Sequence, residues 1–281
     1  MVKITKTSDT KYQYANILIF GESGSGKTHF LGTAPKGEMV ILNITSESGM
    51  LTLRNKDIDI IDINSVSDFE EALRWLATEG VKKYKYVGID SFSQFQKSLE
   101  KQSRTTGWEM WAEIKQITKS MVDRIKEMPI NLIALCEVGL KDDDGMVKYI
   151  PSLVGKSKDE VAYWFDEVYF FEKTGKSGDM PTYRALTNSG SKYPCKSRIG
   201  TLPVVIENPT INFVIEGLKP LMEAESIIAE EKETDNLQII KKLLVEKKVL
   251  LGNVLQAYKV NKLSDLSSID QIDCRKKLQA K

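Results

Sequence analysis

The chain has 281 residues, of which 41% are hydrophobic and 28% are charged, and its formal net charge is +1. These values are ordinary for a globular protein in water, and the near-zero charge excludes a surface that is basic all over, so any nucleic-acid surface must be a local patch. No stretch approaches 18 apolar residues and the first residues lack an apolar signal core, so we expect no membrane span and a cytoplasmic protein.

The first predicted element is an apolar strand over residues 14–20, and the next eight residues read Gly-Glu-Ser-Gly-Ser-Gly-Lys-Thr. They fit the pattern G-x-x-x-x-G-K-[ST] at every position, between a strand and a helix start, which is the context that a phosphate-binding loop requires. Lys27 would lie at the β- and γ-phosphates and the Thr28 hydroxyl on Mg²⁺. We therefore expect ATP and Mg²⁺ at residues Gly21, Glu22, Ser23, Gly24, Ser25, Gly26, Lys27, Thr28 and His29.

Two acids follow the next predicted strands, which cover residues 38–43, 58–63 and 84–90 around a helix at 66–79. Asp90 ends an apolar strand and is followed by Ser91, as in an acid that holds Mg²⁺ through water. Glu47 follows the strand 38–43 and is a candidate base for activating water. Carboxyl ends of strands line the ligand crevice of open α/β sheets, so both acids could reach the phosphates.

A third acid, Glu137, ends the predicted strand 130–136, which comes after a helix at 108–128. Its position at a strand end makes it a second candidate for the group that orients water. The single histidine, His29, argues against a Ser-His-Asp triad or a histidine metal site. Three distant cysteines are expected to be reduced thiols: Cys136, Cys195 and Cys274.

The alternation of strands and helices over residues 1–220 predicts an α/β domain with a mostly parallel, doubly wound sheet. Later strands, close enough together to be partly antiparallel, are expected at 164–171, 181–187, 193–197 and 202–206. An acidic linker is predicted over 221–235, and helix-spaced leucines predict a small helical domain over 236–281.

The segment Lys196-Ser197-Arg198-Ile199-Gly200 carries a family resemblance. With the order phosphate loop, Glu, Asp-Ser, polar strand end and Lys-x-Arg, residues 14–206 resemble the RecA and DnaB superfamily, and most of all the single-core RecA-like P-loop NTPases of bacteriophages. Some of these phage nucleotide-binding proteins act as single-strand annealing recombinases. The resemblance implies a phage protein in a bacterial host cell, which forms a ring or filament with ATP sites at subunit interfaces.

The resemblance also implies roles for individual residues. Lys27 and Thr28 would bind phosphates and Mg²⁺, Asp90 would hold the metal through water, and Glu47 would activate water. Lys196 and Arg198 would reach a neighbouring subunit's γ-phosphate, which makes ATP turnover depend on assembly. Glu137 departs from the family, which usually has a neutral polar sensor there, because a carboxylate repels a γ-phosphate unless a cation intervenes.

RecA-like proteins hold single-stranded DNA with two loops, which correspond here to residues 97–107 and 138–158. Lys and Arg follow a nucleic-acid backbone, although Asp142, Asp143 and Asp144 in the second loop would repel it. The C-terminal unit would bind DNA or recruit a partner such as a single-strand binding protein. The basic residues of the two loops are Lys97, Lys101, Arg104, Lys141, Lys148, Lys156 and Lys158.

Together these features predict a DNA-stimulated, Mg²⁺-dependent ATPase that acts in recombination on single-stranded DNA as an oligomer. A helicase or helicase-loading ATPase of phage replication shares the same ATP site and stays open. So does a nucleotide-gated regulatory or adaptor protein that acts through protein contacts with little hydrolysis. A small-molecule kinase would need an Arg-rich lid, and no clear lid is present.

Overall fold

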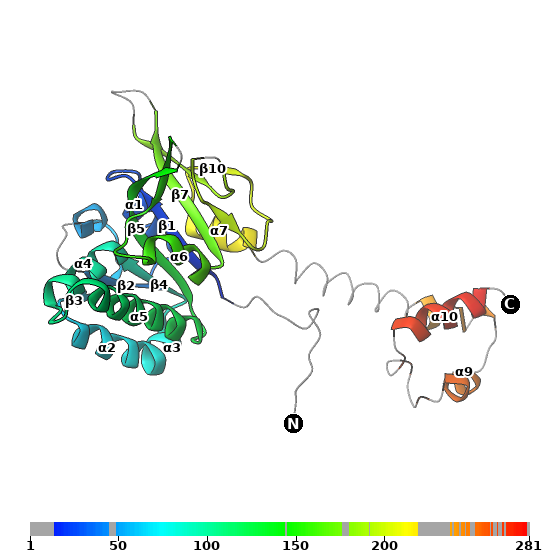
Figure 1. Cartoon of the computed structure of the whole chain (residues 1–281). Helices are drawn as coiled ribbons and strands as arrows, with labels where there is room; N and C mark the ends of the chain where they lie inside the picture. Colours follow the sequence, from blue (N-terminus) through cyan, green and yellow to red (C-terminus); the bar gives the residue numbers. More distant parts are fainter. Residues whose placement is uncertain are drawn as a thin grey trace. The chain divides into compact units, whose positions relative to one another are not determined.

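The fold is given by a computed structural model, in which the chain divides into two compact units, residues 1–219 and 220–281 (Figure 1). The acidic linker expected at 221–235 lies outside the residues that the structure describes. The described residues are 14–44, 49–143, 145–175, 180–190, 192–218, 237, 239–241, 243, 244, 246, 247, 251–258, 260, 263, 266 and 268–279.

A mostly parallel sheet forms the centre of the first unit, as the alternation of strands and helices predicted. Its parallel strands lie in the order β7 (Glu167–Thr174), β1 (Asn16–Gly21), β5 (Asn131–Asp143), β4 (Tyr86–Asp90), β2 (Met39–Ile44) and β3 (Asp59–Ile63). Beyond β7 lie β8 (Thr182–Leu186), which is antiparallel to it, and β10 (Val205–Glu207). The short strand β9 (Lys196–Ser197) pairs antiparallel with the start of β7. The expected antiparallel strands late in the core are therefore confirmed.

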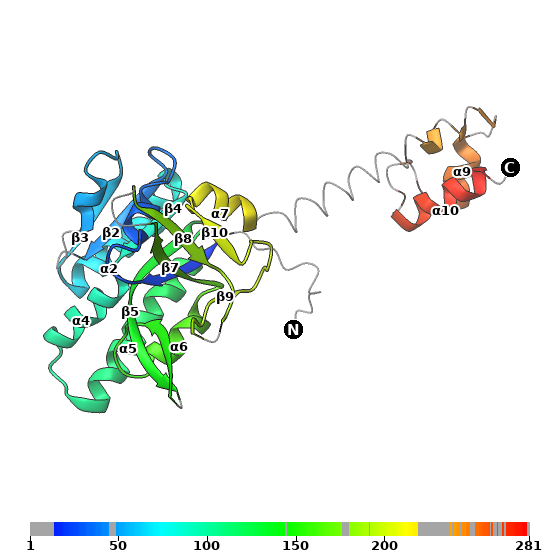
Figure 2. The same cartoon turned by 90° about the horizontal axis from the view of Figure 1, so that it is seen from above.

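Both faces of the sheet are covered, which explains why β1 reads as an unbroken apolar run. Leu18 and Phe20 point into one core cluster, and Ile17 and Ile19 point into the other. Figure 2 shows α7 on the opposite side of the sheet from α5 and α6. The first cluster is covered by α2 (Val66–Trp75), α4 (Phe92–Gln102), α5 (Gly107–Lys126) and α6 (Ser157–Trp164), and the second by α1 (Lys27–Leu31) and α7 (Ile211–Leu218).

The predicted helix 66–79 begins at a capping box, in which Ser65 and Asp68 bond each other's backbone N–H. It continues beyond α2 as a π-helical turn, Leu76–Gly80, and a last short turn, α3 (Val81–Lys83). A short 3₁₀ helix, Gly49–Leu53, follows the sheet strand β2.

Two segments expected to be loops are regular structure instead. Residues 97–102 belong to helix α4, so the first expected loop shrinks to the few residues before α5. Strand β5 runs on from the sheet to Asp143 and pairs with β6 (Met146–Pro151) as a hairpin, and α6 follows. The prediction of a long loop was wrong because β6 supplies the backbone hydrogen-bond partners that let β5 continue beyond the carboxyl end of the parallel sheet.

The second unit contains the helices α9 (Leu251–Tyr258) and α10 (Ser268–Gln279). Tyr258 Oη donates a hydrogen bond to Asp273 Oδ2 at 2.7 Å, which ties the two helices together. Its apolar cluster contains Ile240, Leu244, Val254, Leu263, Leu266, Cys274 and Leu278.

Among the described helices, none combines the length and the apolar character that crossing a bilayer requires. Cys136, Cys195 and Cys274 are buried free thiols, as the sequence predicted. Burial raises the pKa of both Cys136 and Cys195 to about 12, so these thiols stay protonated and unreactive.

Candidate nucleotide site

The Gly-rich segment forms a loop between the carboxyl end of β1 and helix α1. Gly24 and Gly26 have φ angles of +76° and +91°, which glycine adopts without steric cost. A Cβ on Gly21 would lie 2.2 Å from the carbonyl oxygen of Phe171, so the strand leaves no room for a side chain there. The glycines are therefore required by the path of the backbone.

Lys27 closes the loop on itself. Its Nζ donates hydrogen bonds to the carbonyl oxygens of Gly21 and Glu22, each at 2.8 Å. These contacts hold the ammonium group over the hollow of the loop. A polyphosphate anion in the hollow would meet this charge directly.

Thr28 and Asp90 meet across the site from different elements. Thr28 Oγ1, on α1, donates a hydrogen bond of 2.7 Å to Asp90 Oδ2, at the end of β4. Asp90 is only 7% exposed, and burial raises the pKa of its carboxyl, while the hydrogen bond from Thr28 and the charge of Lys27 act in the opposite direction. Burial disfavours the charged form of this carboxylate, and a cation bound beside it would stabilise that charged form.

The oxygens of Thr28 and Asp90 fit Mg²⁺, which prefers hard oxygen ligands and usually keeps only one or two protein ligands beside water and phosphate. Gly49 leaves space beside them, since a Cβ there would lie 3.4 Å from Asp90 Oδ2 and 3.7 Å from Thr28 Oγ1. The described residues contain no cluster of three or more His, Cys, Asp or Glu that could hold a metal alone. The donor set therefore suits a cation shared with a phosphate ligand.

These groups line one cavity of about 590 Å³, large enough for a nucleotide. It extends from the end of β4 and the middle of β5 across the Gly-rich loop to β8. Its lining is Gly21, Ser23, Gly24, Gly26, Lys27, Thr28, His29, Gly49, Thr52, Asp90, Ser91, Glu137, Val138 and Tyr183. Glu22 is exposed outside this lining, and Ser25 is buried with its Oγ unbonded within the described chain.

Glu137 faces the cavity with a counter-ion already attached. Lys97 Nζ lies 2.6 Å from Glu137 Oε2, and Gln94 Nε2 donates to Glu137 Oε1 at 2.6 Å; both partners project from α4. The sequence placed Lys97 in a DNA loop, whereas the structure places it beside the nucleotide cavity. The charge that Glu137 would present to a phosphate is therefore largely compensated within the chain.

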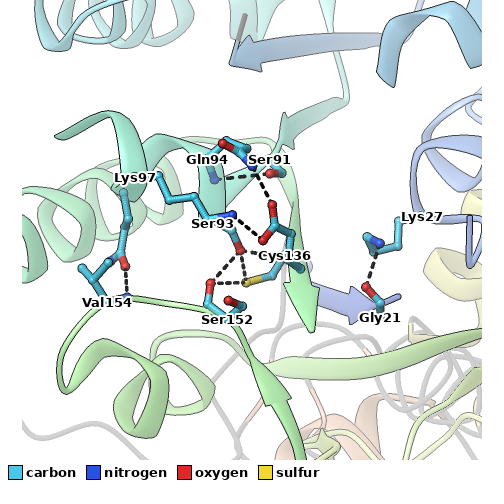
Figure 3. Close-up of polar contacts among 11 residues, drawn as sticks. Gly21, Lys27, Ser91, Ser93, Gln94, Lys97, Cys136, Ser152 and Val154 are labelled. Atoms are coloured by element: carbon cyan, nitrogen blue, oxygen red, sulfur yellow. Dashed lines mark hydrogen bonds and ion pairs between the residues drawn. The ribbon is translucent and has the colours of Figure 1, made fainter. Parts of the chain in front are cut away.

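The backbone around Glu137 is fixed by a small buried polar cluster (Figure 3). Ser93 Oγ accepts a hydrogen bond from Glu137 N at 2.9 Å and donates to the carbonyl of Ser152 at 2.7 Å. Cys136 Sγ lies 3.0 Å from Ser93 Oγ. Helix α4, strand β5 and the end of the hairpin are thus joined at one serine.

Glu47, the other candidate base, lies outside the described residues. Of the acids proposed from the sequence, the described part of the chain brings Asp90 and Glu137 to the cavity.

Lys196 and Arg198 lie at the other end of the sheet strands from the Gly-rich loop. Strand β9 pairs with Glu167 and Val168 at the start of β7, whereas the Gly-rich loop follows the end of its neighbour β1. Within one chain, the two cations and the nucleotide cavity are therefore at opposite ends of the strands.

The two cations also have different surroundings. Lys196 Nζ donates to the carbonyls of Ala162 and Phe165, both at 2.7 Å, and so caps the end of α6. Burial lowers its pKa, and the charge of Arg198 lowers it further. Arg198 is 54% exposed and pairs with Asp166, with Nη1 2.8 Å from Oδ1. Arg198 is the cation that points outward.

The buried Glu167 holds the segment that carries Arg198. Its Oε1 accepts hydrogen bonds from the backbone N–H groups of Arg198 and Ile199 at 3.1 and 3.3 Å, and its Oε2 accepts one from Tyr169 Oη at 2.8 Å. Burial raises the pKa of Glu167, and these hydrogen bonds oppose that rise. Nothing in the local sequence marks this residue as a positioning group, because a lone Glu at a strand start is usually solvated.

The proposed DNA-binding residues separate into two groups. On the hairpin, Lys141 pairs with Asp159 of α6 and Lys148 pairs with Asp143 of β5, so both lysines have an acidic partner. The second group is exposed, as Lys141 also is, and consists of Lys101, Arg104, Lys156 and Lys158.

A family model described as an AAA domain matches residues 13–199 of the chain. No curated protein matches the sequence. The matched range contains the Gly-rich loop, Asp90, Glu137 and the segment of Lys196 and Arg198, and it ends before β10.

Proposed function

The chain belongs to the AAA domain family, and we propose that it is a Mg²⁺-dependent ATPase with a RecA-like organisation, which acts as an oligomer on single-stranded DNA in phage recombination. Membership of this family indicates an AAA-type nucleotide-binding domain of the ATPase kind. The observation that carries the proposal is the contact of Thr28 with Asp90 at 2.7 Å beside the loop closed by Lys27.

Each group that lines the cavity would have one task in ATP hydrolysis. The loop binds the phosphates, and Lys27 exchanges its carbonyl partners for phosphate oxygens. Thr28 and Asp90 would hold Mg²⁺, which supplies charge stabilisation to the transferring phosphoryl group when it is bound. Glu137, oriented by Gln94 and Lys97, is one candidate to orient the attacking water, and Glu47 is the other.

Arg198 is the residue that would make ATP turnover depend on assembly. Because it lies at the opposite end of the strands from the cavity of its own chain, it can serve a phosphate only on another subunit. A guanidinium delivered from a neighbour stabilises charge on the transferring phosphoryl group only after subunits have met. Lys196 is a weaker candidate for this role than Arg198, because its ammonium group already caps α6 within its own chain.

The test is ATP turnover measured across protein concentration, with and without Mg²⁺ and with and without single-stranded DNA. Turnover per subunit should require Mg²⁺, rise with concentration and rise again with DNA. Lys27→Ala should weaken nucleotide binding by about 100-fold, because it removes the charge at the phosphates. Lys36→Ala, which removes an exposed lysine in a surface ion pair, is the matched control.

Each part of the proposal has its own contrary outcome. If nucleotide binding survives Lys27→Ala unchanged, the cavity is not the nucleotide site. Turnover that is indifferent to DNA, in a protein that forms a stable complex with another protein, would indicate the nucleotide-gated adaptor instead. Strand separation that depends on hydrolysis would indicate the helicase class.

A further inference from the structure

The nucleotide cavity has two chemically different ends. Asp90 ends β4 and Glu137 lies within β5, both on one side of β1, and Tyr183 lies on β8, on the other side. His29 contributes the second aromatic ring on this side, and its centroid lies 5.3 Å from that of Tyr183 with a tilt of 39°. One end is therefore acidic and polar, and the other is aromatic.

The polarity of the cavity fixes the direction in which a nucleotide can lie. The cation site of Thr28 and Asp90 suits the terminal phosphates, which carry the most charge. The nucleoside must then leave the loop on the far side from Asp90. That direction leads past His29, the residue after Thr28, toward Tyr183.

Tyr183 is held firmly in this position. Its backbone N–H donates to Asn208 Oδ1 at 3.2 Å, and its carbonyl accepts from Asn208 N at 2.7 Å. Asn208 adopts a φ of +47°, a left-handed conformation that Asn tolerates better than most residues. The ring packs on the phosphate loop itself, since a Cβ on Gly26 would lie 2.6 Å from Tyr183 Cγ and Cδ1.

We infer that Tyr183, together with His29, forms the surface on which the base of a nucleoside triphosphate stacks. This inference rests on the proposed nucleotide site. Tyr183 is half-buried and His29 is exposed, so both rings are open to a ligand. Aromatic rings at the mouth of a polar cavity favour a planar, weakly hydrated ligand group, and every base has such a face. Stacking on Tyr183 does not discriminate among bases, so ATP and GTP gain from it alike.

The experiment separates the base from the phosphates by comparing ATP with inorganic tripolyphosphate, both with Mg²⁺, in isothermal titration calorimetry. Tyr183→Leu should weaken ATP and GTP binding about tenfold and leave tripolyphosphate binding unchanged. Tyr183→Phe should restore the affinity for ATP, because it keeps the ring. Tyr163→Leu is the matched control, since this tyrosine of α6 is 75% exposed and lies outside the cavity lining.

The other outcomes overturn the inference and leave the proposed function distinguishable from it. If Tyr183→Leu binds ATP as the wild type does, the base lies elsewhere while the phosphate site stands. If ATP and tripolyphosphate weaken equally, Tyr183 only supports the loop through Gly26. If the wild-type protein binds neither ligand, both the proposed nucleotide site and the inference fail.

A second measurement needs no variant and so does not depend on the folding of Tyr183→Leu. Photolysis of the wild-type protein with 8-azidoadenosine triphosphate should label the peptides that contain Tyr183 or His29, and excess ATP should prevent the labelling. An adduct confined to other peptides would place the base elsewhere and overturn the assignment.

Discussion

Lys97 and Glu137 form an ion pair at 2.6 Å that joins helix α4 to strand β5 at the nucleotide cavity. Glu137 stands where a neutral polar side chain is expected, and a bare carboxylate there would repel the terminal phosphate of a nucleotide. The ammonium group of Lys97 resolves this conflict. The pair would therefore let an acid lie close to a bound phosphate without the full electrostatic cost.

Lys97→Met should weaken ATP binding three- to tenfold, roughly 1 kcal/mol, because it leaves Glu137 without its counter-ion beside the γ-phosphate. The effect stays modest because both side chains are more than a third exposed and solvent screens them. Adding Glu137→Gln should restore the affinity. The dissociation constants of the wild type, the two single variants and the double variant complete a double-mutant cycle. Lys101→Met, on the same helix, is the control. Equal losses with and without Glu137→Gln would show that Lys97 acts on the nucleotide directly.

Asp90→Asn should stabilise the nucleotide-free protein and abolish Mg²⁺-dependent binding. The folded-state pKa of Asp90 is raised by burial, so its ionisation costs folding free energy as pH rises through that pKa. Below the ordinary pKa of an aspartate, wild type and variant should therefore be similarly stable, and near pH 7 the variant should melt about 2 °C higher. Thermal unfolding across pH 3–7.5 measures this difference, because the window begins below the ordinary pKa of an aspartate. A wild-type protein that gains stability relative to the variant as pH rises would contradict the buried, cation-free carboxylate.

Arg198→Ala should leave ATP binding unchanged and slow turnover about 1000-fold, since an arginine supplied to a transferring phosphoryl group contributes on this scale. Single-turnover kinetics at high protein concentration, combined with calorimetry for affinity, separate the two quantities. Arg74→Ala, an exposed arginine of α2, serves as the control. A further mixing test is informative, because Lys27→Ala subunits that retain Arg198 should rescue Arg198→Ala subunits in trans. Normal turnover by Arg198→Ala would remove the interface arginine from the mechanism.

Single-stranded DNA affinity should depend more on Lys101 and Arg104 than on Lys141 and Lys148. The hairpin lysines are paired with acids and must break those pairs before they meet a phosphate. The double variants Lys101→Ala/Arg104→Ala and Lys141→Ala/Lys148→Ala remove the same charge, so they control for each other. The first should bind an oligonucleotide about tenfold more weakly and lower the salt slope by about 0.7 for each phosphate that the protein no longer neutralises. Equal effects would mean that only net charge matters.

The nucleotide loop and most of the sheet could be predicted because their signals are local. The loop motif depends on glycine φ angles and on consecutive side chains, and the apolar run of β1 reflects burial on both faces. The strand ending in Asp90 was identified in the same way, from an apolar run and its terminal acid. Such features need only neighbouring residues.

The contacts of Lys97, Tyr183 and Lys196 could not be predicted, because each is made with residues far away in the chain. Lys97 and Glu137 are brought together only when α4 packs beside β5. A helix predicted from Ser91 onward would have indicated that Lys97 lies on a helix and not in a loop. Tyr183 reaches Gly26 only because β8 lies two strands from β1. The sequence likewise does not reveal the carbonyl partners of Lys196, which are Ala162 on α6 and Phe165 directly after it.

Strand β5 has a mechanical consequence of its own. One uninterrupted run of 13 residues carries Glu137 at the cavity and ends at the hairpin tip, six residues on, or about 20 Å away in an extended chain. A small tilt of this strand about its sheet neighbours would therefore displace the hairpin tip further than it displaces Glu137. A spectroscopic reporter attached near Met146 would detect such a tilt outside the cavity.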